Sequence, residues 1–445
     1  MTDDVVADGP APTSMKRRLG RAWALTTLTN GTLGLVIFAV SPWAANVLGP
    51  DGRGRLTAIQ LLPQMLADLS SVGLAFSIVH YGSARRGSLR TLLSWSVKPT
   101  IIGTAVMFTI GQLAVLPIVG DHGSDVRFMR IYLLMCPLTA VIVLASESLR
   151  AAGDFGRWNV VTFARGMSWP IALFAGVIRV PSIGRIVMIH LVLTAALMVV
   201  LVVGVWRRTR LARGVPAVDA NQYVRYGLLS AASTVPRTAN AKLDQVVMSF
   251  RVSDRDLGLY SAAVGWSAIT LPIMRGFTGV AMPHVSEAEP GQVPARVRHI
   301  LTASLVATMA LVGLGIAFTL ALWHVRYSQE FNAAFGAALI LVPGGLLLEY
   351  NAILGNVLRS LHRPGLVAVL EVVVLVVSTG ALFVVLNHNT VTGPALVSLA
   401  TYLGACVLYV WFIARELETP ARSLFDFGLV GRLIHQRTSR PAPPR

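Results

Sequence analysis

Stretches of about 20 consecutive apolar residues recur along most of this chain, and they constrain its fold more than any other feature. A helix rises about 1.5 Å per residue, so each stretch is long enough to cross the roughly 30 Å of hydrocarbon in a bilayer. Only 13% of the 445 residues are charged, against about 25% in ordinary soluble domains. The composition therefore disfavours a water-soluble enzyme and predicts an all-α polytopic membrane protein.

The apolar windows between polar breaks predict twelve membrane-spanning helices. They leave only short connections, so no extramembrane domain is expected. The predicted helices cover residues 21–48, 56–80, 91–118, 128–150, 157–178, 185–206, 226–250, 258–285, 299–323, 332–360, 364–388 and 394–415.

The basic residues indicate how the helices are oriented. A net charge of +17 would suggest nucleic acid as the partner of a soluble protein, but here the arginines lie in short segments between apolar windows. They are more than twice as frequent on one side of the predicted bundle, which indicates that both termini are cytoplasmic and that no nucleic acid is involved. We therefore expect cytoplasmic tails at 1–20 and 416–445 and a cytoplasmic linker at 207–225. The segment from Met15 resembles a signal peptide but lacks a clear cleavage site, so it is read as an uncleaved first helix.

The C-terminal tail holds one amphipathic segment, residues 423–437. Helical spacing places Phe427, Val430 and Ile434 on one face, with arginines nearby. Two readings remain open, a helix lying along the inner leaflet or a solvated tail.

Metal, cofactor and redox chemistry find no support in the sequence. Cys136 and Cys406 lie in separate apolar windows, so neither a disulfide framework nor a thiolate metal site is expected. His80, His190 and His284 have no clustered partners. We predict no metal site and no cofactor.

The chain also resembles itself at half its length. LRAAGDFG at 149–156 is echoed by LRSLHRPG at 358–365, an offset of 209 residues. Gly54 and Ala58 are echoed by Gly258 and Ala262, an offset of 204. Six helices per half give the halves the same orientation, related by an axis along the membrane normal. The prediction is an N-lobe at 21–206 and a C-lobe at 226–415, facing each other across a cleft.

Four motifs carry a family resemblance that extends over nearly the whole chain. They are LGPDGRGRL after the first helix, LRAAGDFGRWNV after the fourth, VVMSFRVSDRDLGLYSAA between the seventh and eighth, and AMPHVSE at the end of the eighth. Together they resemble the polysaccharide-transport branch of the multidrug, oligosaccharidyl-lipid and polysaccharide exporter superfamily. This resemblance implies two six-helix lobes that flip polyprenyl-diphosphate-linked glycans by alternating access. The related murein lipid II flippases usually have fourteen helices and arginines in the first. Here the first helix offers only neutral groups such as Thr29 and Asn30, so lipid II is the less expected cargo.

Nine charged residues inside the predicted helices are chemically informative. Facing hydrocarbon, they would cost about 2.5–3.5 kcal/mol each and roughly 25 kcal/mol in total, so they must face water or one another. They are Asp68, Lys98, Arg165, Arg237, Lys242, Asp244, Arg275, Glu349 and Glu371.

Depth divides these residues into three groups, one of which, Lys242 and Asp244, lies farther out than the other two. Counted from the cytoplasmic helix ends, Asp68, Arg237, Arg275 and Glu349 lie about 15–18 Å deep, near the midplane where repeat-built transporters bind substrate. Lys98, Arg165 and Glu371 lie about 10–12 Å deep, where they can snorkel or pair locally.

Arginine offers a permanent charge and a planar fork of donors suited to phosphate oxygens. Arg237 and Arg275 are therefore the predicted diphosphate ligands. The alternative is that they form interlobe salt bridges with Asp68, Asp244 or Glu349, and the two roles can alternate.

Two polar stripes accompany these charges. Gln60, Gln64 and Asp68 recur every four residues, suited either to sugar hydroxyls or to helix packing. Arg237, Asn240 and Asp244 share another face, while Lys242 points elsewhere. We assign Asp68, Asp244, Glu349, Lys242, Asn240 and Gln64 to the central cavity or to ion coupling.

The predicted function is an inner-membrane flippase for a polyprenyl-diphosphate-linked oligosaccharide in cell-envelope polysaccharide synthesis. Its partners would be that glycan, the lipid bilayer, a coupling H⁺ or Na⁺, and glycan synthesis enzymes. One alternative is a small-molecule exporter of the same superfamily, with Asp68 and Asp244 as cation-coupling groups. A membrane glycan polymerase or ligase is disfavoured by the short predicted outer loops, and a nonenzymatic scaffold would leave the midplane charges without a purpose.

Overall fold

The structure is a computed structural model of the chain, and it describes residues 12–71, 73–83, 89–120, 123–209, 219–271, 274 and 290–426. The described residues form helices and connecting turns and contain no strand. Several predicted features lie outside the described residues: Arg275, His284, residues 210–218 of the linker at 207–225, and the tail from Phe427 onward, which includes Val430 and Ile434.

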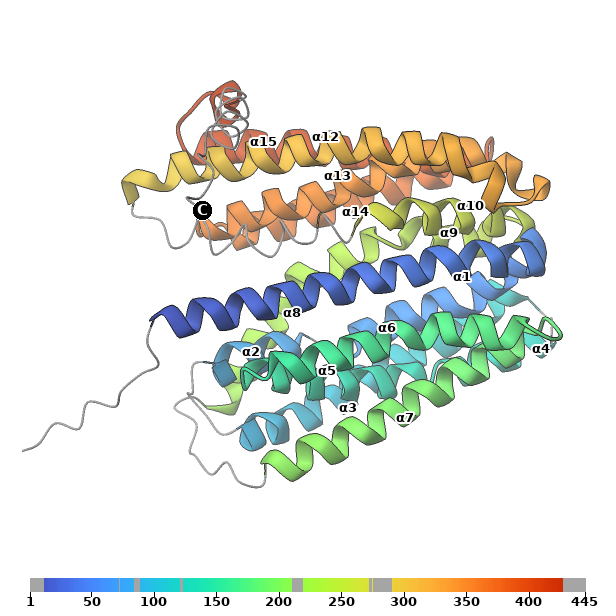
Figure 1. Ribbon diagram of the computed structural model, residues 1–445, viewed down its shortest axis with the longest axis horizontal. Coiled ribbons are helices and arrows are strands. Elements are labelled where there is room, and N and C mark those ends of the chain that lie inside the picture. Colours follow the sequence, from blue (N-terminus) through green and yellow to red (C-terminus); the bar gives the residue numbers. More distant parts are fainter. Residues whose placement is uncertain are drawn as a thin grey trace, which may run out of the picture.

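The first half of the chain forms helices α1 to α7 (Figure 1). Helix α1 contains two crossings, because the backbone turns at Gly49, whose φ of 69° lies in the left-handed region that glycine adopts without strain. The bounds are α1 Pro12–Leu69, α2 Leu74–Ser83, α3 Leu89–Val119, α4 Gly123–Tyr132, α5 Met135–Ala151, α6 Phe155–Val177 and α7 Ile183–Thr209.

The second half forms helices α8 to α15, and short 3₁₀ turns connect several of them. Their bounds are α8 Ala220–Asn240, α9 Leu243–Arg251, α10 Asp254–Ser267, α12 Val293–Arg326, α13 Phe335–Ser360, α14 Pro364–Val385 and α15 Thr392–Glu416.

Within the described ranges, nine helical segments are long and apolar enough to cross a membrane. One of them, Gly31–Gly82, is 52 residues long and carries both crossings of the kinked α1. The α8–α9 segment is not among the nine. It is a much less apolar crossing, because Arg237, Lys242 and Asp244 lie on it. The prediction of a polytopic all-α protein with twelve helices in two lobes is confirmed.

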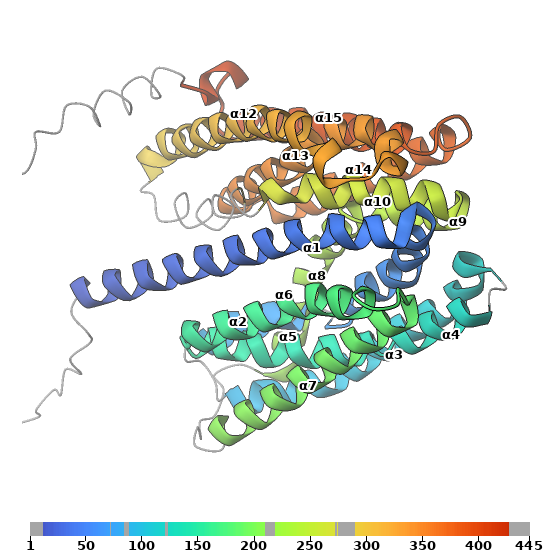
Figure 2. The same ribbon diagram turned by 45° about the vertical axis from the view of Figure 1, so that its right-hand side comes forward.

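Two groups of helices lie side by side in both views (Figures 1 and 2). Helices α3 to α7 belong to one group, and α10 and α12 to α15 belong to the other. Helices α1 and α8 lie between the groups: α1 packs on α6 and α10, and α8 packs on α2 and α14. The bundle has a tail end, where α1 begins and α15 ends, and an opposite end that holds Gly49, called here the Gly49 end.

A reciprocal contact between the halves closes the Gly49 end. A Cβ placed on Gly54 would lie 1.7 Å from the carbonyl oxygen of Asp254, and one placed on Gly258 would lie 1.8 Å from that of Pro50. Gly54 and Gly258 are the positions that the repeat equates, and Pro50 and Asp254 are separated by the same offset of 204. The crossing is therefore symmetric, which confirms the predicted relation between the two halves.

Polar contacts reinforce the same end. Asn46 donates to the backbone oxygen of Arg326 at 2.8 Å and accepts from the backbone nitrogen of Ser328 at 3.0 Å. The Arg326 guanidinium donates to the backbone oxygen of Phe38 at 3.0 Å. Helix α1 is thereby held against α12, so the part of α1 that precedes Gly49 packs on the second half of the molecule.

A different pair of helices joins the halves toward the tail end. Ser77 of α2 donates to the backbone oxygen of Tyr223 of α8 at 2.9 Å, and the Tyr223 hydroxyl lies 2.7 Å from that of Ser96 on α3. Tyr223 is fully buried. Gly73, with φ of 71°, allows close approach, because a Cβ there would lie 2.2 Å from the carbonyl oxygen of Gly227. The start of α8 thus packs into the first group of helices.

The glycine crossing generates a stability prediction. Gly54→Ala forces α1 and α10 apart, so we expect it to reduce the free energy of unfolding by about 1–3 kcal/mol, the cost of overpacking. The measurement is the thermal unfolding midpoint of the purified protein in detergent. Gly313→Ala in α12 is the matched control, because nothing lies within 4 Å of a Cβ there. Equal midpoints for Gly54→Ala and the wild type would contradict the account of the crossing.

Candidate functional site

Two interruptions of membrane-spanning helices bring charged residues to the boundary between the lobes. Asp68 lies in the last turn of α1, just before the chain leaves the helix and resumes as α2 at Leu74. Lys242 lies between α8 and α9, with φ of −131° and ψ of −8° that do not continue the helix. Broken helices are a common way for transporters to expose polar groups at membrane depth.

Asp68 is held by cations from both sides. Its Oδ1 accepts from the guanidinium of Arg165 on α6 at 3.0 Å, and its Oδ2 accepts from the ammonium of Lys242 at 3.1 Å. The exposed fractions of the side chains are 36% for Asp68, 44% for Arg165 and 25% for Lys242. We call these three residues the ion cluster. It links the halves through partly accessible charges and carries one more positive than negative charge.

Partial exposure matters for the energetics of the ion cluster. A fully buried pair must overcome a desolvation cost of several kcal/mol per ion, whereas an exposed pair is worth only about 0–1 kcal/mol. The ion cluster lies between these limits. Its contacts are therefore strong enough to hold a defined geometry and weak enough to be exchanged for those of another anion.

A polar cavity of about 380 Å³ opens beside Asp68, inside the first group of helices. Helices α1, α5, α6 and α7 all contribute to its wall. The lining residues are Leu33, Gln60, Gln64, Ala67, Asp68, Met135, Thr139, Thr162, Arg165, Gly166, Ser168, Trp169, His190 and Thr194.

A chain of hydrogen bonds fixes one wall of this cavity. Gln64 donates to the Tyr132 hydroxyl at 3.0 Å, which lies 2.5 Å from Nδ1 of His190. Nε2 of His190 is 3.2 Å from the Ser168 hydroxyl, which itself donates to the backbone oxygen of Arg165. This series of hydrogen bonds ends at Arg165, which binds Asp68. Hydrogen bonds therefore connect this wall of the cavity to the ion cluster.

The second half holds charged groups that pair with one another within that half. Arg237 of α8 lies 3.6 Å from Glu349 of α13. Asn240 donates to the carboxylate of Glu371 on α14 at 3.0 Å, and Glu371 also accepts from Tyr409 at 3.2 Å. These contacts attach the end of α8 to α13, α14 and α15.

Asp244 of α9 is a third buried acid in this half. It is 8% exposed and accepts from the hydroxyls of Tyr260 at 2.5 Å and Ser398 at 3.4 Å. The backbone N–H of Gln245, in the same helix, donates to the Asp244 carboxylate at 2.8 Å. In the described part of the chain no cation pairs with Asp244, so hydroxyl and backbone donors alone satisfy this carboxylate.

The structure confirms some sequence expectations and corrects others. Gln60, Gln64 and Asp68 line one cavity, as their spacing predicts. The expected interlobe salt bridge exists, but Lys242 makes it, because the helix break directs this side chain across the boundary.

The expectation that Arg237 pairs across the lobes is wrong, because its partner Glu349 lies in its own half. The predicted roles of Arg237 and Arg275 in diphosphate binding stay predictions.

The three charged residues predicted at the shallower depth, Lys98, Arg165 and Glu371, differ in their surroundings. Arg165 and Glu371 have local partners, as described above. Lys98 is exposed on α3, near the exposed apolar side chains of Val97, Ile101 and Ile102.

Sequence reasoning missed the far wall of the cavity. Thr139, Ser168, Trp169 and Thr194 were not predicted to line a site. Arg165, Ser168 and Trp169 follow helical i, i+3, i+4 spacing, as His190 and Thr194 follow i, i+4. A search for polar stripes within apolar helices would have found them.

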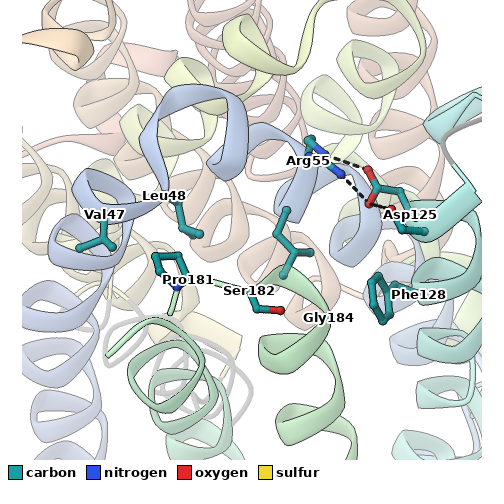
Figure 3. A pocket seen from close by; sticks show the side chains of 10 residues that line it. Val47, Leu48, Arg55, Asp125, Phe128, Pro181, Ser182 and Gly184 are labelled. Carbon is teal, nitrogen blue, oxygen red and sulfur yellow. Dashed lines mark hydrogen bonds and ion pairs between the residues drawn. The ribbon is translucent and has the colours of Figure 1, made fainter. Parts of the chain in front are cut away.

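A second hollow, of about 310 Å³, lies at the Gly49 end (Figure 3). Arg55 and Asp125 point toward one another at its rim, joined by two hydrogen bonds of 2.8 and 2.9 Å. The bidentate pair attaches α4 to α1 next to the turn at Gly49. Arg55 and Asp125 already bind each other, so we assign this hollow a structural role. Within the described residues no group of three or more His, Cys, Asp or Glu side chains is arranged to hold a metal.

The described helices share their fold with solved two-lobe membrane transporters. A solved lipid II flippase, MurJ in an inward closed conformation, matches with a TM-score of 0.70 at 12% identity, over 95% of this chain and 93% of that chain. An inward-facing multidrug resistance MATE family transporter of the MOP superfamily matches with a TM-score of 0.58 at 14% identity, over 89% and 96%. A MOP superfamily transporter from Pyrococcus furiosus, described as having reversed binding-pocket polarity, matches with a TM-score of 0.62 at 12% identity, over 89% and 96%.

The sequence itself assigns the family. A family model described as "Polysaccharide biosynthesis protein" matches residues 45–334, which is more than half of the chain, and the chain belongs to that family. No curated protein sequence matches it.

Proposed function

We propose that this chain is a flippase that moves a polyprenyl-diphosphate-linked oligosaccharide across the bacterial cytoplasmic membrane for cell-envelope polysaccharide synthesis, with both termini in the cytoplasm. The observation that carries the proposal is the ion cluster, in which Arg165 and Lys242 from opposite halves converge on the carboxylate of Asp68. Membership of a polysaccharide biosynthesis family supports a glycan as the cargo.

The ion cluster has the chemistry that a diphosphate requires. In the absence of substrate, Asp68 occupies the position between the two cations and neutralises part of their charge. A diphosphate offers more negative charge and more acceptor oxygens than one carboxylate, and Arg165 adds a planar fork of donors. We infer that the substrate displaces Asp68 and bridges the two lobes, thereby altering the contact that holds them together.

Arg237 and Arg275 are proposed as additional diphosphate ligands along the path. The Arg237 guanidinium is 27% exposed and its 3.6 Å contact with Glu349 is long for an ion pair. Such a contact can be exchanged as the lobes rock. The glycan would travel in the chamber between the lobes while the polyprenyl tail stays in the bilayer.

The function prediction concerns the two cations of the ion cluster. The double variant Arg165→Gln with Lys242→Met should bind undecaprenyl diphosphate about tenfold or more weaker than wild type, because two charge-assisted contacts are lost. The measurement is binding of undecaprenyl diphosphate to protein in nanodiscs, together with flipping of its sugar-linked form in proteoliposomes.

The control for that double variant is Arg363→Gln with Arg415→Gln, which removes two cations at the tail end, where Arg363 pairs with Glu416. We expect the control to bind like wild type. Binding by the ion-cluster variant within twofold of wild type would contradict the proposal. A parallel Arg237→Ala with Arg275→Ala variant tests the second pair of arginines, and it should lose flipping while staying in the membrane.

A second candidate function, a cation-coupled small-molecule exporter, is favoured by one observation. Asp244 is a buried carboxylate satisfied by hydroxyls and backbone, with no cation paired to it among the described residues. A proton or Na⁺ bound there would supply the missing positive charge. The flippase proposal uses Asp244 in the same way, as the coupling group, and differs in requiring the ion cluster for cargo.

The coupling prediction concerns Asp244→Asn, which keeps the size and the acceptor oxygen of the side chain but removes its charge. We expect cargo binding to persist while transport no longer accelerates under an imposed proton or Na⁺ gradient. Wild type and Asp256→Asn, an exposed acid at the start of α10, serve as references. An unchanged gradient response in Asp244→Asn would remove the coupling role.

A further inference from the structure

The cavity beside Asp68 has hydrogen-bonding capacity that the protein does not use. Thr139 is only 3% exposed and lines the cavity, yet its hydroxyl makes no hydrogen bond with any part of the chain that the structure describes. Gln60 likewise has no partner among the described side chains and backbone. Gln64 donates one N–H to the Tyr132 hydroxyl, and its carbonyl oxygen can accept from another donor. These groups line the cavity and have hydrogen-bonding capacity left over, so they favour a polar occupant.

The remaining hydroxyls of the wall are fixed as acceptors. Ser168 donates to the backbone oxygen of Arg165 at 2.7 Å, Thr194 to that of His190 at 2.8 Å, and Thr162 to that of Trp158 at 2.9 Å. Each hydroxyl has thereby used its proton and presents lone pairs. The wall offers amide donors, hydroxyl acceptors and one free hydroxyl, which is the mixture that a ligand with both donors and acceptors requires.

The charges at the cavity cancel. Asp68 and Arg165 are the charged residues of its lining, and they are bound to each other at 3.0 Å. Within the lining these two charges balance, and the excess positive charge of the ion cluster belongs to Lys242, which does not line the cavity. A neutral ligand rich in hydroxyls requires no unbalanced charge in the lining.

The apolar part of the lining suits the face of a ring-shaped ligand. Trp169 lies against His190 in an edge-on arrangement with ring centres 5.2 Å apart, and it lines the cavity with Leu33 and Met135. Aromatic side chains combine a broad apolar face with polar neighbours, which suits a ring that is apolar on its faces and polar at its edge. The volume of about 380 Å³ falls in the range of about 300–1,000 Å³ typical of small-molecule sites.

We infer that this cavity is a carbohydrate subsite that takes an uncharged sugar ring of the cargo. The inference rests on the proposed function, because Asp68 belongs both to the ion cluster and to the cavity lining. A diphosphate held by Arg165 and Lys242 places the sugar attached to it at the mouth of the cavity. Thr139, Gln60 and Gln64 then bind sugar hydroxyls, and Trp169 packs on a ring face.

The experiment compares two kinds of lipid probe with the full chain in nanodiscs. One is farnesyl diphosphate, and the other is a set of three farnesyl-diphosphate-linked sugars carrying glucose, galactose or N-acetylglucosamine. We expect at least one sugar-bearing probe to bind more tightly than farnesyl diphosphate. Thr139→Val, which removes a hydroxyl at constant volume, should weaken that probe about fivefold and leave farnesyl diphosphate unchanged. Thr139→Ser should restore the lost affinity.

The matched control is Thr100→Val on α3. Thr100 is 7% exposed and also lacks a hydrogen-bond partner for its hydroxyl within the described residues, but it lines a different, apolar groove with Ile101 and Phe108. It should leave both kinds of probe unaffected. Equal affinity for all four probes, or an equal effect of Thr139→Val on every probe, would overturn the sugar subsite while the ion-cluster proposal stands. Failure of wild type to bind any of the four would instead overturn the proposed function on which the subsite rests.

Discussion

The arrangement depends on one constraint: a carboxylate in a membrane-spanning segment must be paired, solvated or neutral. Asp68 meets this constraint by binding Arg165 from its own half and Lys242 from the other. The same contacts close the boundary between the lobes, align α6 with α1 and lie beside a polar cavity. An anion that replaces the Asp68 carboxylate therefore acts on the interface between the lobes as well as on a binding site.

The internal repeat explains how such an interface can move. The halves touch through the glycine crossing of α1 and α10 at the Gly49 end and through α2 and α8 toward the tail end. Asp51 and Arg255, which form an ion pair at 3.5 Å, are themselves 204 residues apart, the offset of the repeat. Small residues let the helices approach closely at these two contacts, and exposed polar pairs add little free energy to them. Such contacts suit a molecule whose lobes rock about a shared axis.

The global architecture was accessible from the sequence because apolar length and periodicity depend on local residues alone. The spans follow from the length of the apolar windows, the two-lobe repeat from sequence echoes at one offset, and the shared face of Gln60, Gln64 and Asp68 from spacing along one helix. The ion pairs were not accessible, because they depend on where helices break. Nothing local reveals that α8 ends at Asn240 and frees Lys242 to turn toward Asp68, while Arg237, one turn earlier, turns to Glu349.

The cavity was partly predictable from the sequence. Its residues carry helical spacing that a sequence can show, as in Arg165, Ser168 and Trp169 on α6 and His190 with Thr194 on α7. That two such stripes face each other around Thr139 depends on how α5, α6 and α7 pack. The sequence therefore predicts the participants on each helix, and the tertiary packing decides which of them meet.

The central claim is that the lobes rock to move the cargo, and rocking requires the glycine crossing at the Gly49 end to open. The most direct measurement uses Asp51→Cys with Arg255→Cys, after replacement of Cys136 and Cys406, joined by a short methanethiosulfonate cross-linker that a reductant cleaves. The account predicts that flipping of a polyprenyl-diphosphate-linked sugar in proteoliposomes stops when the link forms and returns when it is cleaved. Undiminished flipping by fully cross-linked protein would contradict it.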